Sequence, residues 1–536
     1  MVDNAVMEKC LATLAAFDEE LEDPRPTIVP AAYRADIWLK VEKYWPRRLL
    51  HIPTMKSIER KGTSTYNGIQ EPNYGILSYT WGRWESNDFD PIQIHGTSWK
   101  IPAVEPEHFT PTMLQAVINE IGRSVDHLWL DIACIDQDDE ATKMDEVGRQ
   151  VGIFAQAHRM YVWLTYLDPV ALHTTLNDFV DCVSYLLFIE LDEDPRPTIK
   201  YVARCLTMLL KDPWFSSLWT LQECTINRKA MILSRDGKPV PARSVDGNFL
   251  LTMLANETCA MIYYLGRLAE EAPHMIQGVE QEIETIRLHA KLAGFGNVYI
   301  SNPNVQYELV RYRTTTRLED RIYGITQIYN LRLGQTLEPS KTFTLNDLKE
   351  QFAEALVTHY PTLSQMFIHT GQPQPGLTWR LTEECEVPWM LHSAPATPPL
   401  CSLTLTEEKA LHCVGTCCGP CDLDRNLVTQ PSVEIYLDRH IEQGLSLAPR
   451  PLLPLLQIKR EGNAGTAAAS LDKVCLAFGE KNVIIVPLVD DHPLTCLLLL
   501  RKHHPTRWER LGLITWLLDN PDELLGHCVP FEGNIF

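Results

Sequence analysis

Positive charge and long hydrophobic runs are both scarce in this chain of 536 residues. Lys and Arg together number 48 against 69 Asp and Glu, so the formal net charge is -21. Nucleic acids and anionic lipids are bound through basic residues, and we therefore expect neither a nucleic-acid partner nor a membrane partner. The apolar run at 494–500 stops at Arg501, far short of the ~20 residues that a membrane helix needs. The first residues lack the features of a secretory signal. We expect a soluble, cytoplasmic protein.

Complete signatures of common enzyme classes are also missing. The sequence contains no Gly-x-Ser-x-Gly motif and no His-Glu-x-x-His motif. Residues 136–147 begin like a calcium-binding loop, but Ala141 stands where the sharp turn needs glycine and Val147 where the bidentate glutamate belongs. These absences argue against serine hydrolases of the nucleophile-elbow type, zinc proteases and EF-hand proteins. With 45% hydrophobic and 22% charged residues, the composition is that of an ordinary globular protein.

The cysteines predict no metal centre. Their number is 15, and most lie within apolar stretches, which is typical of reduced thiols in an intracellular protein. Four of them gather in the segment CVGTCCGPCD at 413–422. Cys418 and Cys421 have the spacing of a redox motif, and four clustered cysteines could bind zinc, although tetrahedral sites usually take paired ligands from two separated segments. We favour a cysteine-rich turn between strands.

Composition and periodicity divide the chain into five segments. We expect a helical lead at 1–69, an α/β domain at 70–235, a mostly helical region at 236–370, a Pro-rich linker at 371–400 and a β-rich C-terminal domain at 401–536. The linker is predicted from the stretches QPQPG and SAPATPP. The C-terminal domain is predicted from short apolar runs separated by turn residues, such as NVIIVPLV and TCLLLL.

The most regular pattern lies within the expected α/β domain. Residues 127–134 form an apolar run that predicts a buried strand, and MYVWLT at 160–165 predicts a second one. Between the two, apolar residues recur at helical spacing, namely Met144, Val147, Val151 and Phe154. This spacing predicts a helix at about 142–157. Strand, helix and strand in this order make a right-handed βαβ unit and imply a parallel sheet.

Two carboxylates stand out against apolar surroundings. Asp131 lies inside the predicted strand, and ligands of parallel sheets bind near the carboxyl ends of strands, so this residue is a candidate for a site. A buried Asp can equally bond backbone donors of a neighbouring loop. Glu223 lies in an apolar helix one turn after Trp219, and Asp212 with Pro213 supplies a helix start signal. The residues alone favour a structural ion pair for Glu223 and leave the role of Asp131 open.

Three blocks resemble, in order and spacing, the fungal heterokaryon incompatibility (HET) domain. They are YGILSYTWG at 74–82, HLWLDIACIDQ with the following KMDEVGRQVGIFAQAHRMYVWL within 127–164, and DPWFSSLWTLQE at 212–223. A later block, YRTTTRLEDRIYGITQIYNL at 312–331, resembles the segment that often follows this domain. The resemblance implies a cytosolic fungal protein whose activation triggers programmed cell death when incompatible hyphae fuse.

HET domains are in turn similar to TIR domains, which implies a flavodoxin-like α/β fold with a parallel sheet. Many TIR domains hydrolyse NAD with one helical glutamate that follows a tryptophan by four positions, a spacing that Trp219 and Glu223 share. By this similarity Glu223 is the expected catalytic residue, with Asp131 as a second candidate. The residues expected to bind NAD are Ser78, Tyr79, Trp81 and Trp219.

Two functions of different class follow from these features. The first is an enzyme that cleaves the nicotinamide–ribosyl bond of NAD, with a carboxylate stabilising an oxocarbenium-like centre; NAD is then a substrate and no cofactor is required. The second is a non-catalytic signalling scaffold that recruits partners through the HET domain, which the lack of a complete catalytic constellation favours. A role in metabolism is a third, weaker alternative. The expected partners are other incompatibility proteins or further copies of this chain.

Overall fold

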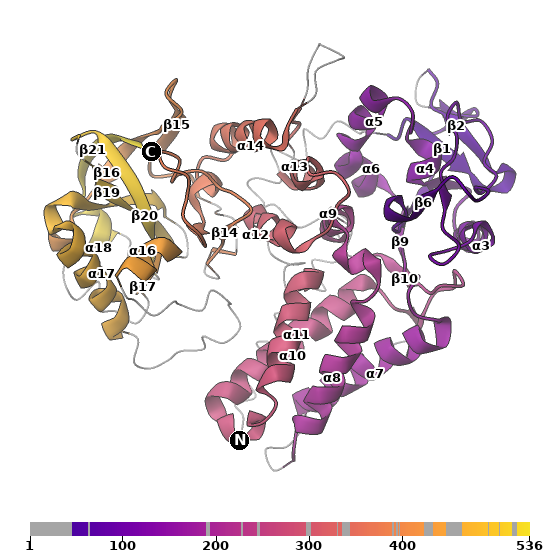
Figure 1. Ribbon diagram of the computed structural model, residues 1–536, viewed down its shortest axis with the longest axis horizontal. Coiled ribbons are helices and arrows are strands. Elements are labelled where there is room, and N and C mark those ends of the chain that lie inside the picture. The colour runs from indigo at the N-terminus through magenta and orange to yellow at the C-terminus, as the bar shows by residue number, and fades with distance from the viewer. Residues whose placement is uncertain are drawn as a thin grey trace.

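The computed structural model describes the chain in a set of segments. These are residues 45–62, 65–188, 193–226, 229–243, 247–295, 302–329, 331–334, 343–388, 391–392, 395, 397–422, 433–445, 464–490, 493–502, 504–516 and 522–536. An α/β sheet with its helices occupies one side of the molecule and a β-rich region the other, with short helices between them (Figure 1).

A six-stranded mixed sheet forms the centre of the first side. Its order is β10–β9–β5–β8–β1–β2, and the bounds in chain order are Arg48–His51 (β1), Lys56–Glu59 (β2), Tyr74–Ser78 (β5), His127–Trp129 (β8), Arg159–Trp163 (β9) and Met231–Leu233 (β10). The strands β10, β9, β5 and β8 are parallel, whereas β1 and β2 pair antiparallel at the edge. Numbered along the chain, the four parallel strands stand in the order 2-1-3-4.

Helices cover this sheet and extend beyond it. The connections carry α3 (Pro111–Ile121), α4 (Asp131–Cys134), α5 (Glu140–Val147), α6 (Gln150–Gln156) and α9 (Leu218–Ile226). Four longer helices pack on one another beside the sheet, namely α7 (Pro169–Phe188), α8 (Arg196–Leu209), α10 (Leu251–Glu271) and α11 (Glu280–Ala293) (Figure 1). One continuous hydrophobic core runs from the sheet into these four helices. The α/β part and the helical part are therefore stabilised together by burial of apolar surface.

The predicted βαβ unit is present, although its helix is interrupted. Three of the four residues at helical spacing are buried, namely Val147, Val151 and Phe154. They belong to two helices, because α5 ends at Val147 and α6 begins at Gln150. Both flanking strands, β8 and β9, pair in parallel with β5, which lies between them. The periodicity thus predicted the buried face correctly and missed the break.

The first strand of this unit is shorter than predicted. A strand was expected over 127–134, with Asp131 inside it, but β8 ends at Trp129 and the helical turn α4 begins at Asp131. The Asp131 carboxylate accepts the backbone N–H of Ile132 at 2.8 Å. An Asp that bonds a nearby backbone donor favours a turn over a continued strand, which accounts for the difference. Asp131 consequently lies beyond the carboxyl end of β8.

The segment expected as a helical lead contributes strands instead. Residues 48–51 and 56–59 form β1 and β2, whereas residues 1–44 lie outside the described residues. Leu49 and Leu50 are adjacent and both fully buried. Adjacent residues of a strand face opposite sides of the sheet, so burial of both identifies a strand that is covered on each face.

The Pro-rich segment expected as a linker at 371–400 contributes several buried residues to the core. Trp379, Leu381 and Val387 are buried, and Cys385–Glu386 (β14) pairs with Ile368–His369 (β13). The apolar residues between the prolines decide which parts of the segment are buried. Further two-stranded ribbons are β3 (Thr65–Tyr66) with β4 (Ile69–Gln70), β6 (Glu85–Ser86) with β7 (Ala103–Val104), and β11 (Pro241–Ala242) with β12 (Gly247–Asn248).

A β-rich C-terminal region is present, as predicted. Its sheet has the order β15–β16–β21–β20–β19–β18, with a further strand, β17, on β20. The bounds are Ser402–Leu405 (β15), Leu411–Cys417 (β16), Val433–Leu437 (β17), Val483–Val489 (β18), Leu494–Arg501 (β19), Arg507–Trp516 (β20) and Val529–Ile535 (β21). The sheet is essentially antiparallel; β20 and β21 pair in parallel only at Arg507 and Trp508.

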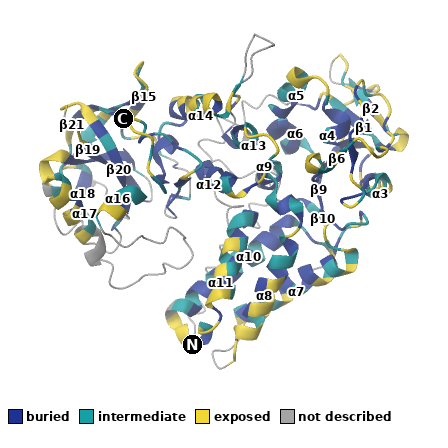
Figure 2. Cartoon of the chain, in the orientation of Figure 1, coloured by how far each residue is buried: buried dark blue, intermediate teal, exposed yellow. Residues whose placement is uncertain are grey.

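Both faces of this second sheet are covered. Ile484 and Val486 of β18 belong to a core shared with α12 (Pro303–Leu309), α13 (Asp320–Thr326) and α14 (Leu345–His359). Val483 and Ile485 belong to a second core, shared with α16 (Arg439–Gly444), α17 (Ala464–Phe478) and α18 (Asp522–Leu525). Strands covered on two faces need apolar residues at every position, which explains the uninterrupted apolar runs of the sequence. Exposed residues gather instead on the outer faces of helices (Figure 2).

Among the described residues, no helix combines the length and the hydropathy that crossing a membrane requires.

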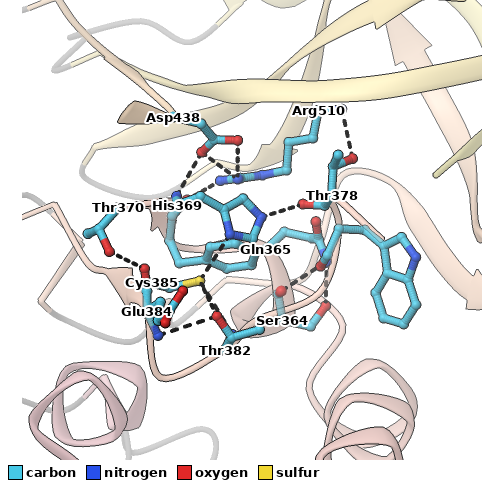
Figure 3. A network of polar contacts seen from close by, with 12 residues as sticks. Ser364, Gln365, His369, Thr370, Thr378, Thr382, Glu384, Cys385, Asp438 and Arg510 are labelled. Carbon is cyan, nitrogen blue, oxygen red and sulfur yellow. Dashed lines mark hydrogen bonds and ion pairs between the residues drawn. The ribbon is translucent and has the colours of Figure 1, made fainter. Parts of the chain in front are cut away.

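A buried ion pair joins the ribbon β13–β14 to the C-terminal sheet. Arg510 of β20 and Asp438, which follows β17, are both fully buried, and Nη1 of the arginine lies 3.0 Å from Oδ1 of the aspartate. Asp438 also accepts the backbone N–H of His369 at 2.8 Å, and Arg510 donates to the carbonyl oxygen of Phe367 (Figure 3). Both charges are thus met by an opposite charge and by hydrogen bonds, which a buried pair requires.

Replacing the arginine of this pair by methionine tests its contribution. Arg510→Met leaves the Asp438 carboxylate buried without its cation, and we expect the free energy of unfolding to fall by ~3–5 kcal/mol. The control is Lys409→Met, which breaks a pair with Glu350 whose side chains are 54% and 49% exposed; exposed pairs contribute at most ~1 kcal/mol. Urea denaturation followed by circular dichroism measures both variants. Equal losses for the two would contradict a special role for the buried pair.

Candidate functional site

The carboxyl ends of three neighbouring parallel strands meet at one edge of the first sheet. β5 ends at Ser78, β8 is followed by Asp131, and β9 is followed by Thr165. Open α/β sheets bind ligands at this edge, because the loops that follow the strands gather there. The residues at this edge therefore define the candidate site.

Glu223 reaches this edge from α9. Its Oε2 atom accepts a hydrogen bond from the hydroxyl of Ser78. Ser78 is buried, and its hydroxyl oxygen accepts a hydrogen bond of 2.8 Å from the indole Nε1–H of Trp214. The hydroxyl thus uses its donor on the carboxyl group and its acceptor on the indole. The residues alone favoured a structural ion pair for Glu223, but among the described residues its carboxyl group is bonded to a hydroxyl.

The surroundings of Glu223 favour its neutral form. Burial raises the pKa of this carboxyl group from 4.5 to about 8, and the negative charge of Asp131 also raises it, while the hydrogen bond from Ser78 opposes both. The side chain is nevertheless only partly buried, so solvent reaches part of it. A carboxyl group with a pKa near neutrality can exchange its proton at cellular pH, as catalytic carboxyl groups do.

Asp131 is held by three donors at the same edge. Its carboxylate accepts from Nε1–H of Trp81 at 2.5 Å, from the hydroxyl of Tyr79 at 2.8 Å and from the backbone N–H of Ile132 at 2.8 Å. Burial raises the pKa of Asp131. The three hydrogen bonds oppose this shift, but the pKa remains raised. Tyr79 is buried, whereas Asp131 and Trp81 are partly exposed. Tyr79 therefore positions the carboxylate from the buried side, whereas the ring of Trp81 is partly open to solvent.

A third carboxylate, Asp212, fixes the loop that follows β9. It accepts the backbone N–H groups of Thr165 at 2.7 Å and Tyr166 at 2.9 Å, and that of Trp214 at 2.9 Å. The predicted cap at Asp212 is confirmed, although it opens a 3-10 turn (Pro213–Ser216) just ahead of α9. Burial raises the pKa of Asp212 to about 6 against these three donors. This carboxylate aligns Trp214, and through it Ser78.

Trp219 lies apart from the hydrogen bonds that hold Glu223 and Asp131. Its Nε1–H donates to Oδ2 of Asp320 at 3.3 Å, and the same oxygen accepts from the hydroxyl of Thr315 at 2.8 Å. Trp219 had been expected beside Ser78, Tyr79 and Trp81 as a ligand-binding residue. The structure instead places its indole N–H against the block at 312–331.

That block also supports α9, through a residue not singled out from the sequence. Arg313 is buried and donates to the carbonyl oxygens of Ser217 at 3.2 Å and Ala293 at 2.9 Å. The backbone N–H of Leu218 bonds the carbonyl oxygen of Thr314 at 3.0 Å. These contacts hold the first turn of α9, the helix that carries Glu223. The resemblance of this block to the segment after HET domains was the signal that pointed to it.

The site offers carboxyl groups and an indole, with no assembled metal centre. Among the described residues, no three His, Cys, Asp or Glu side chains are arranged to hold a metal ion. Two carboxyl groups of raised pKa, Glu223 and Asp131, supply acid–base capacity and can stabilise a cation. The partly exposed ring of Trp81 supplies a flat apolar surface beside them. This chemistry suits a substrate with a cationic centre and an aromatic group.

The pKa of Glu223 predicts a pH dependence of stability. A carboxyl group whose pKa rises on folding binds its proton more tightly in the folded state, so stability is lost as pH rises from about 4.5 to about 8. Glu223→Gln removes this contribution. We expect the melting temperature of the variant to fall less between pH 5 and pH 9 than that of the unaltered chain, whereas the exposed control Glu354→Gln should follow the unaltered chain. Superimposable curves for all three proteins would show that Glu223 titrates normally.

Comparisons with known proteins agree on the family of this region. Residues 74–223 match the family "Heterokaryon incompatibility protein (HET)". The chain is also similar to "Heterokaryon incompatibility protein 6, OR allele" of Neurospora crassa, with 24% identity over 192 residues. That similarity covers 28% of this chain and 27% of the relative, so the chain spans about a quarter of the relative's length. No solved structure matches the chain. Ser78, Asp131 and Glu223 all lie within the matched residues, and the chain therefore carries a HET domain at residues 74–223.

Proposed function

We propose that this protein acts in heterokaryon incompatibility, as an effector of cell death that hydrolyses NAD at the edge formed by Ser78, Asp131 and Glu223. The role in incompatibility is supported by the HET domain and by the similar Neurospora crassa protein. The hydrolysis is supported by one observation above all. A helical glutamate is held by a buried serine at the carboxyl edge of a parallel sheet, with a pKa near neutrality.

The proposed reaction breaks the bond between the ribose and the nicotinamide of NAD. Positive charge moves from the nicotinamide ring onto the ribosyl carbon as the bond breaks, and water then adds to that carbon. An ionised carboxylate beside the ribosyl carbon stabilises this developing cation. Glu223 is largely protonated at neutral pH in the free protein, but a bound cationic ring favours the carboxylate, because an opposite charge nearby lowers a carboxyl pKa.

The other residues of the edge take supporting roles in this proposal. Ser78 and Tyr79 are buried and bonded to Glu223 and Asp131, so they position the two carboxyl groups. Trp81, whose ring is partly exposed, stacks on an aromatic group of the substrate. The similarity to TIR domains is supported by the strand order 2-1-3-4, since flavodoxin-like sheets begin with that order.

Glu223→Gln separates the catalytic role from a structural one. Glutamine keeps the size and the acceptor for Ser78 but cannot stabilise a cation by charge. We expect release of nicotinamide from NAD to fall at least ~100-fold, as loss of one stabilising group typically does, while the protein stays folded. The control is Glu354→Gln, an exposed residue of α14. Nicotinamide is quantified by chromatography at low and high protein concentration, so that an activity requiring self-association is not missed.

The same variants separate the enzyme from the alternative, a non-catalytic scaffold. The alternative has its own support in exposed apolar side chains on and beside α7 and α8, namely Tyr166, Val170, Tyr185, Phe188 and Tyr201. Exposed apolar side chains are the groups through which partner proteins are commonly bound. If Glu223→Gln kills cells on overexpression as well as the unaltered chain does, and neither protein releases nicotinamide, NAD hydrolysis is wrong and the scaffold is the better account.

A further inference from the structure

Two cysteines far apart in the sequence meet at one end of the C-terminal sheet. The ladder between β16 and β21 ends with the pair Cys417 and Val529. Continued by one step, the register brings Cys418 opposite Cys528. Residues opposite one another in antiparallel strands have Cα atoms ~4.5–5.5 Å apart, and a disulfide needs ~4.4–6.8 Å. The strand geometry therefore suits a bond between these two cysteines.

The packing of the side chains agrees with this register, because Cys528 packs against the core that contains Cys418. The thiol of Cys418 and the side chain of Thr416 are near enough to Cys528 to lower its pKa. Thr416 lies in β16 and Cys418 directly follows that strand, two positions further on, so both side chains face the same side of the sheet. In its thiol form Cys528 donates to the carbonyl oxygen of Leu524 in α18, at an Sγ–O distance of 3.7 Å.

The two cysteines differ in exposure and in acidity. Cys528 is partly exposed, whereas Cys418 is buried. The hydrogen bond from Cys418 lowers the pKa of Cys528, with help from Thr416, while the same contact and burial raise the pKa of Cys418. A thiolate is the reactive form of cysteine. Cys528 is thus the thiol that a reagent can reach from solvent. Cys418 is the neighbouring thiol that can react with it afterwards.

We propose that Cys528 and Cys418 form a reversible disulfide on exposure of the protein to a hydroperoxide. The Cys528 thiolate attacks one peroxide oxygen, the O–O bond breaks, and the other oxygen leaves as water or an alcohol after taking up a proton. The product is a sulfenic acid on Cys528. The sulfur of Cys418 then attacks that sulfur, the S–O bond breaks, and the hydroxyl leaves as water with the proton of Cys418. Two thiols are oxidised and one peroxide is reduced.

This pairing differs from the one that sequence spacing suggests. The segment Cys418-Gly-Pro-Cys421 has the spacing of a redox motif, whereas the register of β16 and β21 brings Cys418 to Cys528. The bond would tie the end of β16 to the segment between α18 and β21. Linking two distant segments restricts the unfolded chain, so the oxidised protein should melt at a higher temperature than the reduced protein.

Peptide mapping of the full chain tests the proposal. The reduced protein is treated with equimolar hydrogen peroxide, remaining thiols are alkylated, and proteolytic peptides are analysed by mass spectrometry. We expect one cross-linked species joining the peptides of Cys418 and Cys528, two hydrogens lighter than their sum, which dithiothreitol reverses. A disulfide from Cys418 to Cys421 or to Cys496, or full alkylation of both Cys418 and Cys528, would overturn the proposal.

Serine variants assign the order of attack. Cys418→Ser should leave Cys528 as a sulfenic acid that dimedone labels, because the resolving thiol is gone. Cys528→Ser should abolish both the cross-link and dimedone labelling of the pair. The control Cys259→Ser removes a partly buried thiol of α10 and should leave the cross-link unchanged. Dimedone labelling of Cys418 in the Cys528→Ser variant would contradict the assignment of Cys528 as the attacking thiol. The peptide mapping uses the unaltered chain, so it tests the disulfide even if one of the variants folds poorly.

Discussion

The hydroxyl group of Ser78 is the contact on which the carboxyl edge of the first sheet depends. It accepts from the indole of Trp214 and donates to Glu223, so it joins the end of β5 to the turn before α9 and to α9 itself. Because Ser78 is buried, the loss of any partner would leave a polar group unpaired in a place where water cannot replace it. The position of Glu223 is thus set by the central strand of the sheet as well as by its own helix.

The site also depends on residues beyond the region that matches the HET family. Arg313 and Thr314 bond the backbone at the start of α9, and Asp320 accepts from Trp219 in the same helix. These contacts come from the block at 312–331, which begins about 90 residues after the end of the family match. That separation is of the same order as the length of a small domain. The helix that carries Glu223 is therefore held from the sheet on one side and from this later block on the other.

Local patterns in the sequence predicted local structure well, and contacts between distant segments escaped them. The helical spacing of apolar residues and the Asp212 cap depend on neighbours a few positions away, and both were correct. One local feature was missed as well, because β8 ends before Asp131, whose carboxylate bonds the next backbone N–H. Trp219 shares a helix and a spacing with Glu223, but its partner, Asp320, is a residue no local pattern connects to it. No local pattern connects Ser78 to Glu223 either. Ser78 had been singled out only as a residue expected to contact a ligand.

The most direct test of this account is the titration of the Glu223 carboxyl group itself. Difference infrared spectroscopy of the unaltered chain against Glu223→Gln isolates the band of one protonated carboxyl group as pH is raised. We predict that this band is lost with a midpoint of about 8, and that Ser78→Ala moves the midpoint higher, because the serine hydrogen bond favours the ionised form. A midpoint near 4.5 that Ser78→Ala does not change would contradict the account.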